Sequence, residues 1–188
     1  HKCNRNWIKK LLEDTNMKQE KVNEFISKSL EHGRPNMHSV IDELKKYKKF
    51  TNDEIFEIFN SLFSRQGLLV TPNNLSELIS FIGQIRKPKT IIDICCGTGK
   101  ILNYFKDSQT KTGVDINFDI IQLAKFINPE IEFTVANSLE YDFKNAHYDL
   151  VIGSLPFGVR TKDKKSLEIE LIKIGLSVLS INGVAIFI

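Results

Sequence analysis

The sequence predicts an α/β protein with a parallel, doubly wound sheet, preceded by a small α-helical module. Two observations predict the sheet. After residue 67, short apolar segments rich in β-branched residues alternate with helix-length amphipathic segments, and some of the apolar segments end in an acid or a glycine turn. The first 66 residues instead carry helical periodicity and few strand signals. We therefore expect two domains, residues 1–66 and 67–188.

Composition indicates a globular protein. The 188 residues are 41% hydrophobic and 26% charged, with a formal net charge of +3. No apolar run approaches the roughly 20 residues that cross a bilayer, and the N-terminus lacks a signal-peptide pattern. Cys3 and the adjacent Cys95 and Cys96 cannot form a disulfide framework or a spaced zinc site. We expect a cytoplasmic protein with no membrane partner and no metal.

Helical spacing organises the N-terminal module. Its first two apolar stripes are Trp7, Ile8, Leu11 and Leu12, and then Val22, Phe25, Ile26 and Leu30. Ser39 with Asp42, and Thr51 with Glu54, have the spacing of a capping box at a helix N-terminus. The lysine-rich stretch 45–49 could bind phosphate groups. We favour the alternative that it is a solvent-exposed helix end, where lysines complement the helix dipole.

The second domain begins with a predicted helix. Thr71 is its expected N-cap, and Pro72 suits the first helical turn. Its expected buried face is Leu75, Leu78, Ile79 and Ile82. Further strands are expected over 111–116, 131–135, 148–152 and 183–188, with helices over 117–126 and 167–179.

Residues 90–100, with the sequence TIIDICCGTGK, organise the rest of the domain. A short buried strand ends near Asp93, the turn Gly97-Thr98-Gly99 follows, and a helix-like segment begins at Lys100. This order brings backbone N–H groups close to a ligand at the carboxyl edge of a parallel sheet. An acid before the turn repels a pyrophosphate but suits the ammonium end of an amino-acid-like ligand.

Asp115 ends the second predicted strand, about 20 residues beyond the glycine turn. A carboxylate at this place can accept hydrogen bonds from both hydroxyls of a ribose. The position fits NAD as well as S-adenosylmethionine, and the acid before the turn favours the second.

Together these residues resemble a known family. Residues 93–99, DICCGTG, resemble the D-x-x-C-G-x-G signature of S-adenosylmethionine-dependent N6-adenine DNA methyltransferases, especially the modification subunits of type I restriction systems. Thr71-Pro72 is similar to that family's T-P element, and residues 153–158, GSLPFG, resemble its N-P-P-F-G loop. The likeness covers about residues 65–188 in the family's order. It implies a Rossmann-like methyltransferase fold with S-adenosylmethionine as cofactor.

The resemblance implies a set of cofactor-binding residues. These are Thr71, Pro72, Asp93, Cys95, Gly97, Gly99, Asp115, Ile116, Asn137 and Ser138. In the family's arrangement Asp93 faces the cofactor's amino group, Asp115 holds the ribose, and Ile116 packs on the adenine ring. Asn137 stands where the family usually has Asp, and its amide oxygen can accept from the adenine amine; a turn asparagine is the alternative.

The loop after the fourth strand departs from the family. There, a side-chain oxygen and then a backbone carbonyl accept hydrogen bonds from the target amine and orient it for in-line methyl transfer. Here the first position is Ser154, whose side-chain oxygen lies closer to the backbone than that of asparagine. The second is Leu155, which lacks the φ restraint of proline. Pro156 and Phe157 complete the implied catalytic loop, with Phe157 as the ring on which a flipped base stacks.

The resemblance implies methyl transfer to the N6 amine of adenine in double-stranded DNA, with specificity and restriction subunits as partners. A full sheet of this class has seven strands, and the sequence stops within the fifth predicted strand. We therefore expect a missing C-terminal portion or completion by other chains. Two alternatives stay open: a non-catalytic cofactor- or DNA-binding subunit with a degenerate loop, or a methyltransferase acting on RNA or protein glutamine.

Overall fold

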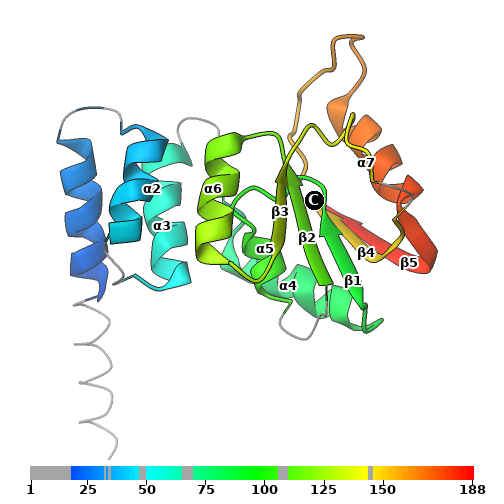
Figure 1. Cartoon of the computed structure of the whole chain (residues 1–188), viewed down its shortest axis with the longest axis horizontal. Helices are drawn as coiled ribbons and strands as arrows, with labels where there is room; N and C mark the ends of the chain where they lie inside the picture. The colour runs from blue at the N-terminus through cyan, green and yellow to red at the C-terminus, as the bar shows by residue number, and fades with distance from the viewer. Residues whose placement is uncertain are drawn as a thin grey trace, which may run out of the picture. The chain divides into compact units, whose positions relative to one another are not determined.

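The computed structural model describes residues 18–31, 33, 35–46, 50–64, 70–105, 110–143 and 146–188 (Figure 1). The chain divides into two compact units, His1–Leu69 and Val70–Ile188. Within the described residues, no helix has both the length and the apolar character needed to cross a bilayer.

Helices build the described part of the first unit. Residues 18–30 are helical, α2 spans Met37–Lys46, and α3 spans Asn52–Phe63. The buried apolar residues of this unit are Val22, Phe25, Val40, Ile41, Leu44, Ile55, Phe56, Ile58, Phe59, Leu62 and Phe63. Leu30, predicted to lie on an apolar stripe, is 48% exposed. The stripe over residues 7–12 lies outside the described residues.

One of the two predicted capping boxes is confirmed. Thr51 Oγ1 accepts a hydrogen bond from Glu54 N at 3.3 Å, and Thr51 N donates to Glu54 Oε2 at 2.6 Å. The prediction of a capping box at Ser39 is wrong, because α2 begins two residues earlier, at Met37. Asn36 Oδ1 accepts from Ser39 N at 3.2 Å, so an asparagine three residues upstream provides the acceptor at this helix start.

Five parallel strands form the sheet of the second unit. They are β1 Thr90–Asp93, β2 Thr110–Asp115, β3 Glu132–Val135, β4 Tyr148–Gly153 and β5 Leu179–Phe187. Their order is β3-β2-β1-β4-β5, and every neighbouring pair is parallel. The predicted doubly wound α/β fold is confirmed. The strand order reverses direction at β1, where such sheets bind ligands beyond the carboxyl ends of their strands.

Helices cover both faces of this sheet. They are α4 Asn73–Gln84, α5 Lys100–Asn103, α6 Phe118–Ile127 and α7 Leu167–Ser177. Alternating residues of β1 point to opposite faces. Ile91 belongs to one buried cluster with Ile79 of α4 and Ile121 of α6. Ile92 belongs to a second cluster with Leu171 of α7.

The predicted buried face of α4 is partly wrong. Ile79 is buried, but Leu78 is 52% exposed and Ile82 is 43% exposed. Small residues, including Gly83, face the core instead. A Cβ at Gly83 would lie 2.7 Å from a methyl group of Leu150, so the helix approaches the sheet too closely for a large side chain.

Two boundaries also differ from the sequence prediction. Pro72, rather than the expected Thr71, occupies the N-cap position of α4. Among the described residues, no side chain caps this helix start by a hydrogen bond. Helix α7 ends at Ser177 and β5 begins at Leu179 rather than Gly183. Tyr148 pairs with Leu179, and Tyr148 N donates to Val178 O at 2.8 Å, so pairing with β4 determines where β5 starts.

Candidate active site

Strand ends that carry most of the predicted site residues meet at the carboxyl edge of the sheet (Figure 1). Asp93 of β1 lies opposite Gly113 of β2 on one side and Ile152 of β4 on the other. Asp115 ends β2 and Gly153 ends β4. Because the strands are parallel, the glycine turn, the Asp115 carboxylate and the loop after β4 share this edge.

Asp93 is 1% exposed, and only one of its carboxylate oxygens has a protein partner. Oδ1 accepts a hydrogen bond from Cys95 N at 3.0 Å, whereas Oδ2 is buried with no partner among the described residues. Burial raises the pKa of this carboxyl from 3.8 to about 7; the Cys95 N–H lowers it in part, and the Asp115 charge raises it. A buried acceptor without a donor is costly. The ammonium group of S-adenosylmethionine supplies such a donor, so this geometry fits the predicted contact.

The Asp115 carboxylate holds the turn that follows β1. Its Oδ2 accepts a hydrogen bond from Gly97 N at 2.9 Å, and its Oδ1 accepts from Asn117 N at 2.9 Å. Cys96 N also donates to Val114 O at 3.0 Å, which ties the turn to β2. Each carboxylate oxygen keeps a second lone pair. The half-buried Asp115 can therefore hold this turn and still accept from ribose hydroxyls as predicted.

Gly97 and Gly99 both have left-handed backbones, with φ of +50° and +74°. A Cβ at Gly97 would meet no atom within 4 Å, so the space above this residue is open to a ligand. A Cβ at Gly99 would lie 2.5 Å from the Phe133 ring and 3.2 Å from Asn128 Nδ2. Packing against β3 therefore requires glycine at 99, whereas Gly97 allows the close approach that the resemblance implies.

Of three further predicted residues, Asn137 and Ser138 have side-chain partners within the protein, and Cys95 is a half-buried thiol. Asn137 Oδ1 accepts from Leu139 N at 3.1 Å, which is the turn arrangement given above as the alternative. The buried Ser138 hydroxyl donates to Ile94 O at 2.5 Å and joins the loop after β3 to the end of β1. Burial raises the pKa of the Cys95 thiol well above its usual range. Contacts of all three with the cofactor stay predictions.

The remaining cofactor-binding candidates lie at the start of α4 and just after β2. Ile116 is 70% exposed and offers a large apolar side chain to a flat ring. Pro72 O accepts from Ser76 N at 2.9 Å, and the Thr71 side chain has no hydrogen bond to any described residue. Closure of Thr71 and Pro72 over the methionine part of the cofactor stays a prediction.

The backbone of the loop after β4 is held by Ile188, which follows β5. Ile188 N donates to Gly153 O at 3.1 Å, and Leu155 N donates to Ile188 O at 2.9 Å. The Leu155 side chain is buried with the Ile92 cluster. Proline has no N–H and could not form the second bond. The restraint that the family obtains from a proline ring is thus replaced here by pairing with the end of β5.

Two acceptors in this loop lack donors. Neither the Ser154 hydroxyl oxygen nor the Leu155 carbonyl receives a hydrogen bond from any described residue. Pro156 is half-buried, and Phe157 is 74% exposed. The loop therefore presents two free acceptors followed by an accessible aromatic ring.

Sequence reasoning missed Glu168, which fixes the far end of the loop. Gly158, with φ of +70°, donates its N–H to Glu168 Oε1 at 2.5 Å, and the Ser166 hydroxyl donates to the same carboxylate. The Ser166 hydrogen bond, with the backbone N–H groups and Arg160, lowers the pKa of Glu168. The sequence did offer one signal for Glu168, because it is an acid in the first turn of the helix predicted over 167–179.

Comparison with known proteins finds methyltransferases. The family model described as "Methyltransferase domain" matches residues 91–171, which include the glycine turn, Asp115 and the loop after β4. Residues 91–171 are thus similar to a methyltransferase domain. Over 73 residues the chain is 37% identical to "Putative methyltransferase 235L" of Invertebrate iridescent virus 6. That match covers 37% of this chain and 27% of the viral protein.

Solved structures with the same fold include two methyltransferases. The type I restriction-modification methyltransferase subunit from Streptococcus thermophilus is 18% identical, with a TM-score of 0.57 over 79% of this chain and 42% of that one. CalS10, an S-adenosylmethionine-bound amino pentose methyltransferase from Micromonospora echinaspora, is 15% identical, with a TM-score of 0.54 over 66% of this chain and 53% of that one.

At these identities the likeness establishes the fold, which is the predicted Rossmann-like S-adenosylmethionine-dependent methyltransferase fold. S-adenosylmethionine, the predicted cofactor, is the cofactor of the methyltransferase domain. The chain spans about half, or less, of the length of the relatives named above.

Proposed function

We propose that the protein transfers a methyl group to the N6 amine of adenine in DNA, as the modification subunit of a restriction-modification system. The observation that carries this proposal is the loop after β4. Ser154 Oγ and the Leu155 carbonyl are two free acceptors in consecutive residues, and the exposed Phe157 follows them. A primary amine on a flat base has two hydrogens to donate and a ring to stack, so this loop matches its chemistry.

S-adenosylmethionine, when bound, supplies a methyl group on an electrophilic sulfonium. Asp93 and Asp115 would hold its ammonium and ribose groups, and Gly97 leaves room for the approach. Ser154 and Leu155 would accept the two amine hydrogens, which turns the nitrogen lone pair out of conjugation with the ring. Phe157 stacking then fixes the plane of the flipped base, so positioning and hydrogen bonding supply the catalysis.

Two alternatives make different predictions. A non-catalytic subunit would bind cofactor but transfer no methyl group. A glutamine methyltransferase would use the same two acceptors for an amide, but it would have less use for an exposed aromatic ring, which favours a base. The likeness to the Streptococcus thermophilus subunit supports the fold only, and the substrate proposal therefore rests on the loop.

The test measures tritium transfer from labelled S-adenosylmethionine to unmethylated DNA. Base–aromatic stacking is worth roughly 1–3 kcal/mol, so Phe157→Ala should lower transfer about 5- to 150-fold. Binding of S-adenosylhomocysteine, measured by calorimetry, should stay unchanged. Phe81→Ala is the matched control, since Phe81 on α4 is 72% exposed and Phe157 is 74% exposed.

The outcomes separate the candidate functions. Equal transfer by Phe157→Ala and wild type would remove this loop from the mechanism. A wild-type chain that binds S-adenosylhomocysteine but methylates no DNA would favour the non-catalytic alternative. Methyl transfer to a glutamine peptide in place of DNA would favour a glutamine methyltransferase.

A further inference from the structure

A short hairpin follows the catalytic loop and precedes α7 (Figure 1). Arg160 and Ser166 form an antiparallel bridge, and Thr161 N donates to Lys165 O at 2.9 Å. Leu167 N donates to Val159 O at 3.0 Å, which closes the base of the turn. We name residues 159–167 the basic hairpin. None of the cofactor-binding or base-binding roles described above uses it.

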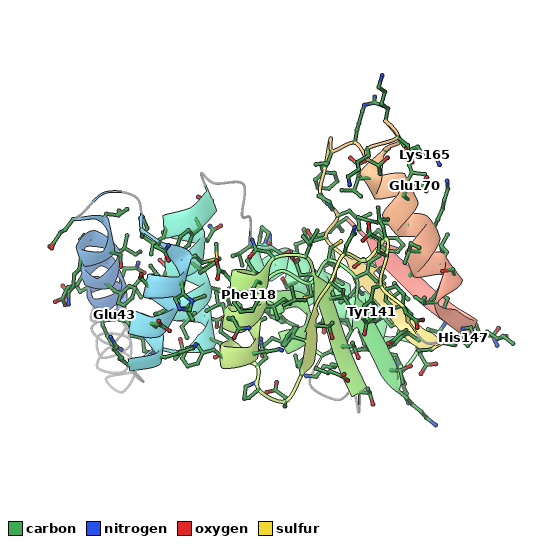
Figure 2. All side chains as sticks on the ribbon, turned by 45° about the horizontal axis from the view of Figure 1, so that its top comes forward. Glu43, Phe118, Tyr141, His147, Lys165 and Glu170 are labelled. Carbon is green, nitrogen blue, oxygen red and sulfur yellow. The ribbon has the colours of Figure 1, made fainter. Side chains whose placement is uncertain are left out.

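Positive charge is concentrated in the basic hairpin. Residues 160–165 include four cations, Arg160, Lys162, Lys164 and Lys165, and a single acid, Asp163. This net charge of +3 equals that of the entire 188-residue chain. All five charged residues are exposed. In Figure 2, Lys165 lies on the hairpin where it extends beyond α7, away from the strands.

The lysines of the hairpin are available to a ligand. Lys162, Lys164 and Lys165 form no ion pair with any described residue. The nearest acids in sequence on α7 have other partners, because Glu168 binds Gly158 N and Ser166, and Glu170 binds Lys173 at 2.7 Å. The charges of Glu168 and Glu170 act on Arg160 and Lys165, but neither acid forms an ion pair with a hairpin lysine.

The hairpin is also ordered in advance of binding. Arg160 Nη1 donates to Lys164 O at 2.9 Å, and Thr161 Oγ1 accepts from Lys165 N at 3.2 Å. Glu168 ties the hairpin base to Gly158, directly after Phe157. A binding element held this way loses less conformational entropy when its ligand docks.

Building on the proposed function, we infer that the basic hairpin binds the phosphate backbone of the DNA duplex beside the flipped adenine. At no more than about 3.6 Å per residue, Lys162 lies within about 18 Å of Phe157 along the chain. Duplex DNA carries one negative charge per roughly 1.7 Å of its axis, so several phosphates fall within this reach. The hairpin would add affinity and register without reading sequence.

The test compares two double variants of the full chain. Lys162→Gln with Lys165→Gln removes two hairpin charges and leaves Arg160, whose guanidinium supports the hairpin backbone. Lys89→Gln with Lys125→Gln removes two exposed lysines elsewhere in the same unit. The probe is a short fluorescent duplex made only of G·C pairs, with binding followed by anisotropy against salt concentration. Because this duplex contains no adenine, the measurement does not depend on methyl transfer.

Each phosphate contact contributes about 0.9 to the slope of log affinity against log salt. The hairpin variant should lower that slope by about 1.8, so its affinity loss between roughly 50 and 200 mM salt should be about tenfold smaller than that of wild type. The control variant should keep the wild-type slope, and both should bind S-adenosylhomocysteine normally.

Equal slopes for the hairpin and control variants would overturn the inference, as would a wild-type chain that does not bind the duplex. If polyglutamate displaces the fluorescent duplex as well as unlabelled DNA does at equal charge, the hairpin would instead bind an acidic protein. If the hairpin result holds but adenine-containing DNA is not methylated, the inference survives and the proposed function fails.

Discussion

The Asp115 carboxylate accepts a hydrogen bond from Gly97 N at 2.9 Å, so the end of β2 shapes the turn that follows β1. The acid predicted to hold a ribose therefore also positions the backbone that is predicted to approach the rest of the cofactor. This double role joins two motifs that are about 20 residues apart in sequence.

Asp115→Ala should weaken S-adenosylhomocysteine binding by about 1.5–3 kcal/mol, the usual worth of hydrogen bonds to a charged group. The loss includes any loosening of the turn at Gly97. Calorimetry on the variant checks this, with Asp119→Ala as control, because Asp119 is a half-buried acid in the first turn of α6. Unchanged affinity in Asp115→Ala would contradict the assignment of Asp115 to the ribose.

Cofactor affinity should depend on the ionisation of Asp93. Its pKa of about 7 means that the carboxyl is largely neutral below that pH, where it attracts an ammonium group poorly. S-adenosylhomocysteine affinity should therefore fall by up to about tenfold per pH unit below pH ~7. Asp93→Asn should bind weakly and with little pH dependence over this range. A wild-type affinity that is flat with pH would rule out Asp93 as the ammonium partner.

The same shift predicts how stability depends on pH without cofactor. The folded pKa of about 7 lies above the ordinary value of 3.8, so folding favours the protonated form. The contribution of Asp93 is fully present below pH ~4 and is lost as pH rises through ~7. Asp93→Asn should therefore gain stability relative to wild type between these pH values. Urea unfolding at both ends of the range measures the difference, and a constant difference would contradict it.

Gly99→Ala should destabilise the protein more than Gly158→Ala. Both glycines have positive φ, +74° and +70°, so each alanine costs about 1–2 kcal/mol of backbone strain. Only the Gly99 Cβ meets a neighbour, the buried Phe133 ring at 2.5 Å, which adds about 1–3 kcal/mol of overpacking. Urea unfolding should rank the variants in that order, and equal losses would show that Phe133 moves aside freely.

Leu155→Pro, although it restores the family's residue, should harm this protein. It removes the donor to Ile188 O, which costs about 0.5–1.5 kcal/mol, and replaces a buried leucine. Leu155→Met is the control, because it keeps the N–H and most of the apolar volume. The proline variant should unfold at lower urea than the methionine variant. Greater stability or faster methyl transfer in Leu155→Pro would show that the pairing with Ile188 is dispensable.

The sequence alone determined the order and type of the elements in the second unit. Short β-branched runs between amphipathic segments are local signals, and they placed the strands within a few residues of their observed bounds. Because parallel strands end at one edge, the predicted strand ends place Asp93 and Asp115 at the carboxyl edge of the sheet, whereas the role of Ser154 came only from the family resemblance. These properties follow from neighbouring residues and from one general rule of sheet topology.

Only the tertiary structure decided which groups contact one another across that edge. Ser138 bonds Ile94, and Ile188 replaces a proline restraint at Leu155. Likewise Gly83, rather than Leu78 or Ile82, faces the core from α4, because Leu150 and Phe105 occupy the space from another layer. Periodicity reports which residues share a face, but it cannot report how close the opposing layer lies or which backbone groups remain unpaired when the strands come together.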